Sequence, residues 1–70
     1  MSFKRRDIIR YLERHGFFFL REGSNHTIYR NKKGVCVPVG RHSTFTRKEA
    51  NNICKEAGLK PIFREDIYIS

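Results

Sequence analysis

Three histidines, His15, His26 and His42, are the side chains of this chain best suited to acid–base chemistry. The unperturbed pKa of an imidazole lies near neutrality, so a histidine can both accept and donate a proton there. His26 follows the small and polar run Gly23-Ser24-Asn25, which leaves space for a phosphodiester to approach the ring. On position alone, a structural role and a catalytic role for His26 both remain open.

The other two histidines have simpler interpretations. His15 falls in the last turn of a predicted helix, where a cation complements the negative end of the helix dipole. His42 lies in a polar loop beside Arg41, where it could contact a phosphate or remain a solvated loop residue. His26 therefore has the most suggestive position of the three.

The chain is strongly basic. Its 15 Lys and Arg residues against 7 Asp and Glu residues give a formal net charge of +8. Nine of the basic and three of the acidic residues belong to residues 1–33, so the excess is concentrated in the first half. Such an excess indicates a polyanionic partner, most often nucleic acid, with a merely soluble basic protein as the alternative.

Size and composition exclude several classes of protein. Seventy residues allow one small two-layer core and no enclosed cofactor cavity. No apolar run is long enough to span a membrane or to form a signal peptide, which predicts a cytoplasmic location. No carboxylate cluster fits magnesium, so we expect neither metal nor cofactor. Cys36 and Cys54 lack C-x-x-C spacing and fall at apolar positions, which predicts reduced core thiols.

The hydrophobic pattern predicts a helix, three strands and a second helix, at residues 4–15, 17–21, 26–31, 35–37 and 46–57. Ser2 is expected to cap the first helix, and Thr46 with Glu49 matches the capping box at the start of the second. Pro38 is expected to close the third strand. The predicted fold is α+β in the order α-β-β-β-α. A three-stranded antiparallel sheet carries two helices on one face, as in double-stranded-RNA-binding domains.

Four motifs occur in the order and with the spacing found in the HicA toxins, small mRNA interferases of type II toxin–antitoxin systems. They are Gly16-Phe17, Gly23-Ser24-Asn25-His26, Val35-Cys36-Val37-Pro38 and the run Ile53-Cys54-Lys55-Glu56-Ala57-Gly58-Leu59. The chain resembles this family over residues 3–59. We therefore expect residues 1–60 to form a HicA-like RNA-cleaving domain and residues 61–70 a tail of uncertain structure.

The resemblance implies cleavage of mRNA by a single essential histidine on the strand after the glycine turn, which here is His26. It also implies a cognate HicB-type antitoxin that covers the site. Many members of the family place a histidine directly after the Val-Pro strand, whereas here His42 lies four residues beyond Pro38.

The chemistry of RNA suggests how such an enzyme would work. A general base removes the proton of a 2′-hydroxyl group, the alkoxide attacks the adjacent phosphorus, and cations or amides stabilise the charge that develops. We predict neutral His26 as the base, without a metal ion. The residues expected to contact RNA are Ser24, Arg30, Lys32 and Lys33 near the phosphate, together with Lys4, Arg5, Arg41 and His42.

Two other functions fit the same sequence. The first is a non-catalytic RNA-binding module whose basic helix and turn contact phosphates by shape. The second is a partner-binding protein whose basic face docks an acidic protein. Cleavage of RNA by the purified chain would separate the enzyme from both.

Overall fold

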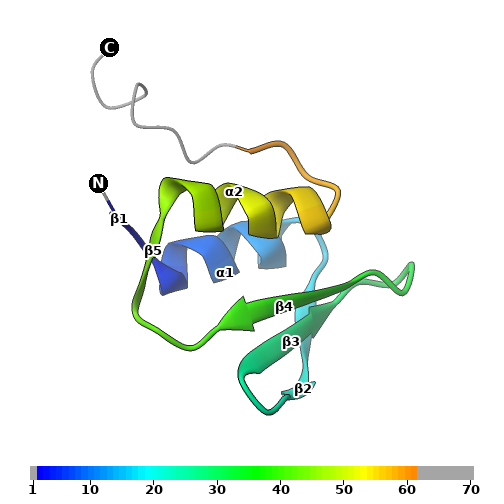
Figure 1. Ribbon diagram of the computed structural model, residues 1–70. Coiled ribbons are helices and arrows are strands. Elements are labelled where there is room, and N and C mark those ends of the chain that lie inside the picture. Colours follow the sequence, from blue (N-terminus) through cyan, green and yellow to red (C-terminus); the bar gives the residue numbers. More distant parts are fainter. Residues whose placement is uncertain (1, 62–70) are drawn as a thin grey trace.

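The computed structural model describes residues 2–61 and confirms the predicted α-β-β-β-α plan. The elements are β1 (Ser2–Lys4), α1 (Arg5–Arg14), β2 (Phe18–Glu22), β3 (His26–Arg30), β4 (Cys36–Gly40), β5 (Thr44–Thr46) and α2 (Arg47–Glu56). Strands β2, β3 and β4 form an antiparallel sheet in that order, and α1 and α2 lie side by side on one of its faces (Figure 1). Nearly all of the predicted tail, residues 62–70, lies outside the described residues.

The alternation of β3 decides which way its side chains point. Thr27 and Tyr29 are buried toward the helices, whereas His26 and Arg30 are exposed. Tyr29 belongs to a hydrophobic core that also contains residues of β4 and both helices, including Val37, Val39, Ile8, Leu12, Ile53 and Cys54. A shift of one residue in register would bury His26 and expose Tyr29, so core packing keeps the imidazole on the accessible side.

A short ribbon joins the starts of the two helices and was not predicted. β1 pairs antiparallel with β5, which places Phe3 opposite Phe45, and both rings are buried. Strands of three residues are too short to show a period in the sequence. Because Ser2 belongs to this ribbon, the prediction that it caps α1 was wrong; the capping position is Lys4, whose side chain makes no capping hydrogen bond.

The third strand of the sheet is longer than expected. Pro38 does not close it, because β4 runs through Pro38 to Gly40, with Pro38 opposite Ile28. β4 is the outer strand in the order β2-β3-β4, and an edge strand tolerates a residue without an N–H group. The extension matters for the site because it brings Gly40 opposite His26.

The prediction for the two cysteines was half right. Cys54 is buried in the core, but Cys36 is exposed. Strand alternation accounts for this difference, because Val37 and Val39 take the inward positions of β4 and leave Cys36 pointing outward.

The capping box of α2 is present as predicted. The Thr46 side chain accepts a hydrogen bond from the backbone N of Glu49 at 3.2 Å, and the backbone N of Thr46 donates to Glu49 Oε1 at 2.8 Å. Hydrogen bonds from the Thr46 backbone and side chain lower the pKa of Glu49. The cap therefore fixes the start of α2 and also one oxygen of the Glu49 carboxylate.

Replacing Thr46 by Ala should lower the free energy of unfolding by about 1 kcal/mol, because an orphan amide of α2 loses its acceptor. Urea denaturation followed by circular dichroism measures this difference. Thr44→Ala is the matched control, since Thr44 is exposed on the same strand and has no capping role. Equal destabilisation by the two changes would contradict the assignment of the cap.

Candidate active site

His26 is the first residue of β3 and is exposed, and its imidazole makes no hydrogen bond, ion pair or ring contact within residues 2–61. His15 is different: its Nδ1 lies 3.0 Å from the Tyr11 carbonyl oxygen, and its ring packs edge-on against Tyr11 at 4.7 Å. The interpretation of His15 as a helix-end residue therefore agrees with its contacts. A structural role for His26 has no such support, because its imidazole is left open to an outside group.

The turn before His26 is closed by its own backbone. The N–H of Gly23 donates to the carbonyl oxygen of His26 at 2.7 Å. A Cβ atom on residue 23 would lie 3.0 Å from that same oxygen, closer than side chains normally come. This close approach favours glycine here, and the turn leaves Ser24 exposed two residues before His26.

The Arg41 side chain holds this turn in place by hydrogen bonds. Its Nε donates to Glu22 Oε1 at 3.0 Å, its Nη1 donates to the Ser24 carbonyl at 3.1 Å, and its Nη2 donates to the carbonyls of Gly23 and His26. An ion pair of 2.9 Å joins Nη2 to Glu22 Oε1. A guanidinium carries five N–H donors, so most of this fork is engaged within the chain.

Thr27 and Arg5 continue the same network toward α1. The Thr27 hydroxyl donates to Glu22 Oε1 at 2.9 Å and accepts from Arg5 Nη2 at 2.9 Å, while Arg5 Nε donates to the Gly40 carbonyl at 2.8 Å. The hydrogen bonds from Thr27 and then from Arg41 lower the pKa of the Glu22 carboxyl. The four side chains of this network, Arg5, Glu22, Thr27 and Arg41, are called the turn clamp below.

The turn clamp changes the interpretation of two predicted RNA contacts. The guanidinium groups of Arg5 and Arg41 hydrogen-bond to the protein, so both residues hold the turn in place. Sequence reasoning missed Glu22 and Thr27 altogether. The available signal for Glu22 was its negative charge in the basic half of the chain. Its separation of 19 residues from Arg41 gives no indication that the two side chains pair.

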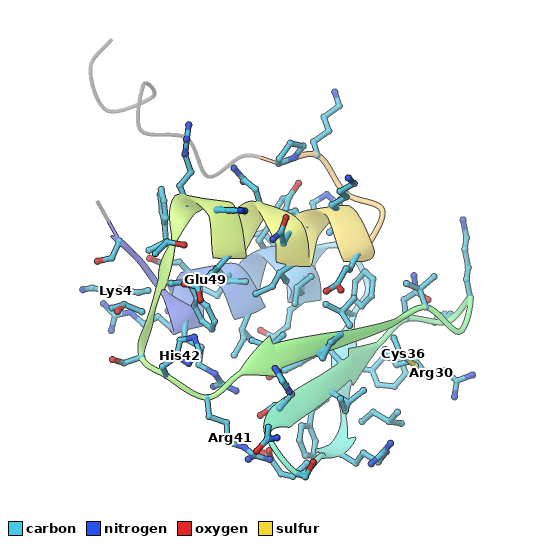
Figure 2. The ribbon with its side chains drawn as sticks, viewed as in Figure 1. Lys4, Arg30, Cys36, Arg41, His42 and Glu49 are labelled. Atoms are coloured by element: carbon cyan, nitrogen blue, oxygen red, sulfur yellow. The ribbon has the colours of Figure 1, made fainter. Side chains whose placement is uncertain are left out.

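His26 and His42 come together at one shallow pocket of about 200 Å³. The other residues of its lining are Pro38, Gly40, Phe45, Glu49, Asn52 and Ile53. The His42 ring packs on Phe45 with 4.5 Å between ring centres, and its Nε2 lies 3.9 Å from Glu49 Oε2. Figure 2 shows His42 and Glu49 on the same side of the molecule, near the start of α2.

The remaining predicted contacts lie elsewhere. Arg30 ends the strand that His26 begins, so its Cα is about 13 Å from that of His26 at the usual rise of a strand. Figure 2 shows Arg30 beside Cys36, far from His42. Lys32 and Lys33 lie in the turn beyond, lining a separate hollow with His15. The structure does not bring these three cations together with His26.

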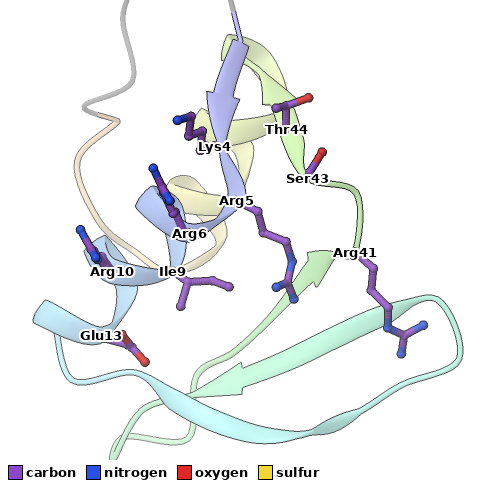
Figure 3. Close-up of a pocket in the computed structure, with 9 residues that line it drawn as sticks. All are labelled: Lys4, Arg5, Arg6, Ile9, Arg10, Glu13, Arg41, Ser43 and Thr44. Atoms are coloured by element: carbon purple, nitrogen blue, oxygen red, sulfur yellow. The ribbon is translucent and has the colours of Figure 1, made fainter.

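A strongly basic groove of about 780 Å³ lies on the other side of the turn clamp (Figure 3). It is lined by Lys4, Arg5, Arg6, Ile9, Arg10, Glu13, Arg41, Ser43 and Thr44. Arg5 and Arg41 extend from its walls toward the β2–β3 hairpin, where they enter the turn clamp (Figure 3). Lys4, Arg6 and Arg10 are exposed and carry no such contacts within residues 2–61, so they give the groove its available positive charge.

Two further classes of site are not found in the described part of the chain. Residues 2–61 contain no group of three His, Cys, Asp or Glu side chains that could hold a metal ion. The two helices of this region are also too short and too polar to cross a membrane.

Comparison with known protein families identifies a family for this chain. A model described as the HicA toxin of bacterial toxin–antitoxin systems matches residues 5–59, well over half of the chain. The match begins with α1 and ends just after α2, so it includes the sheet and both pocket histidines. No curated protein and no solved structure matches the chain.

Replacing Glu22 by Gln should destabilise the protein at neutral pH, because the ion pair with Arg41 is lost. The pKa of Glu22 is lowered in the folded state, so its contribution is present above the unfolded value of about 4.3 and disappears as the pH falls through the folded value. Urea denaturation at several pH values should therefore show a difference from the parent that is largest near pH 7 and shrinks in acid.

Glu13→Gln is the control for this change, because Glu13 is also exposed and makes no side-chain ion pair within residues 2–61. A Glu22→Gln difference that stayed constant from pH 7 to pH 3 would contradict the turn clamp.

Proposed function

The chain belongs to the HicA family of toxins from bacterial toxin–antitoxin systems, and on this premise we propose that it is an endoribonuclease that cleaves mRNA with neutral His26 as general base. Family membership makes the chain a toxin and supports a nuclease role in general terms. The observation that carries the assignment to His26 is its exposed imidazole, which has no partner within residues 2–61 and follows a turn held by the turn clamp.

The proposed reaction uses the 2′-hydroxyl of RNA as its nucleophile. His26 removes the 2′-proton, the 2′-oxygen forms a bond to phosphorus, and the bond from phosphorus to the 5′-oxygen breaks. The departing 5′-oxygen takes up a proton, so that the proton removed from the 2′-hydroxyl is balanced. The products are a 2′,3′-cyclic phosphate and a 5′-hydroxyl end. A correctly placed base contributes about 10²- to 10⁴-fold to such a step. No metal ion is needed in this scheme, because the nucleophile is internal and the base is a side chain.

The RNA strand would reach His26 along the basic groove. The groove offers Lys4, Arg6 and Arg10 to backbone phosphates, and the chain segment at Gly40 and Arg41 lies between it and the histidine pocket. Contacts to phosphate position a nucleic acid without reading its sequence. Ser24, exposed on the turn two residues before His26, would add a hydrogen bond at the reacting phosphate.

The family also implies a HicB-type antitoxin as the partner that silences this toxin. An antitoxin that blocks the pocket would have to cover His26, and an acidic surface would match the groove. The proposed mRNA substrate would be cleaved in the cytoplasm, and we propose that location for the toxin.

His26→Ala should reduce the rate of RNA cleavage by about 10²- to 10⁴-fold, because the base is removed. Cleavage of a labelled mRNA by purified protein measures the rate, in the presence of EDTA to test independence from metal. Expression of the variant should also fail to arrest growth.

His15→Ala is the matched control, since it removes an imidazole that lies outside the pocket. Undiminished cleavage by His26→Ala would contradict the proposal that His26 is the base. Complete absence of cleavage by the parent, with RNA binding retained in both proteins, would favour the non-catalytic RNA-binding module.

Replacing Arg6 and Arg10 together by Gln should weaken RNA binding and make it less dependent on salt. Loss of two phosphate contacts to a single strand lowers the slope of log K against log salt by about 1.4. Fluorescence anisotropy at several salt concentrations measures this slope, with His26→Ala as the background so that the RNA stays intact.

Lys55→Gln with Lys60→Gln removes the same charge outside the groove and serves as the control. If both double variants weaken binding equally, net charge rather than the groove determines affinity.

A further inference from the structure

His42 takes the place of a side chain that Gly40 lacks. His26 and Gly40 are directly opposed in the β3–β4 pairing. A Cβ atom on residue 40 would lie 2.8 Å from Cε1, 3.3 Å from Nε2 and 3.4 Å from Nδ1 of His42. The His42 ring therefore occupies the position in which the cross-strand neighbour of His26 would normally stand.

This arrangement puts the His42 ring next to the sheet position that is opposite His26. The Cβ atoms of opposed residues in an antiparallel pair are about 4.5–5.5 Å apart. Because Cε1 of His42 lies 2.8 Å from where a residue-40 Cβ would be, the His42 ring lines the same pocket as His26 without contacting its imidazole. The pocket of about 200 Å³ that both histidines line has room for a group the size of a phosphodiester.

His42 is held in this place from two sides. Its ring lies against the buried ring of Phe45, 4.5 Å between centres. Glu49 uses Oε1 for the capping box of α2, and its other oxygen, Oε2, faces His42 Nε2 at 3.9 Å. His26 and Glu49 are the titratable groups that share the pocket with His42. A separation of 3.9 Å is too long for a hydrogen bond, so the nitrogens of the His42 ring stay available to a substrate.

We propose that His42 is the general acid that protonates the 5′-oxygen leaving group of the RNA, opposite His26 as the base. This inference rests on the proposed ribonuclease function. As the 2′-oxygen bonds to phosphorus, its proton passes to neutral His26. As the bond from phosphorus to the 5′-oxygen breaks, protonated His42 gives its proton to that oxygen. The step consumes no net proton, and exchange with water restores both histidines.

The assignment predicts a bell-shaped dependence of the cleavage rate on pH. The rate rises with pH as the base loses its proton and falls at higher pH as the acid loses its own. His42→Ala should lower kcat by about 10²-fold or more and remove the fall at high pH, whereas the rise at low pH persists. Gly40→Ala, which crowds the ring without altering it, should give the same change in weaker form.

A substrate with sulfur in place of the bridging 5′-oxygen isolates the acid step, because a thiolate leaves without being protonated. A dinucleotide of this kind should restore cleavage by His42→Ala to near the parent rate and should not restore His26→Ala. His15→Ala should behave as the parent with both substrates. Circular dichroism of each variant confirms that it is folded.

These experiments distinguish failure of the ribonuclease function from failure of the role proposed for His42. If the parent cleaves neither substrate, the ribonuclease function itself fails. If the parent cleaves both, but His42→Ala raises KM alone and keeps the bell-shaped profile, His42 only binds RNA and the inference is overturned. An equal loss on both substrates overturns it as well.

Discussion

The Arg41 guanidinium is the interaction on which the site depends, because it ties the turn before His26 to the rest of the molecule. Arg41 reaches Glu22 and the backbone carbonyls of Gly23, Ser24 and His26. A hairpin turn on a small sheet would otherwise be one of the less restrained parts of a chain of this size. Ordering it in the folded protein means that a substrate need not supply that ordering on binding. The same hydrogen bonds occupy the guanidinium of Arg41, a residue that charge alone would predict to bind RNA.

The extension of β4 past Pro38 has an equally direct consequence for chemistry. Had the strand ended at Pro38, the chain would have left the sheet before reaching His26. Because it continues to Gly40, a residue without a side chain is opposite His26, and His42 of the following loop lies against that glycine. Pro38 is tolerated on the edge strand, and Gly40 leaves space for the His42 ring, so that His26 and His42 line one pocket.

The sequence was informative where a signal repeats or is local. The capping box at Thr46 and Glu49, the alternation from His26 to Arg30 and the order of helices and strands were all predicted, because each is written in neighbouring residues. The β1–β5 ribbon and the turn clamp were not, because they join residues far apart in the chain through strands of three residues or single side chains. Exposure of Cys36 was missed for a related reason: the phase of β4 depends on its pairing with β3.

The basic side chains of this chain therefore fall into two groups that net charge cannot separate. Arg5 and Arg41 use their planar forks for hydrogen bonds within the protein, a task for which lysine lacks the geometry. Lys4, Arg6 and Arg10 remain exposed along the groove. Because these side chains make no hydrogen bonds within the described protein, they are available to bind the phosphate backbone. A proposed RNA path thus runs beside arginines that shape the site. Affinity and catalysis should consequently respond to different arginines, although all of them contribute equally to a formal charge of +8.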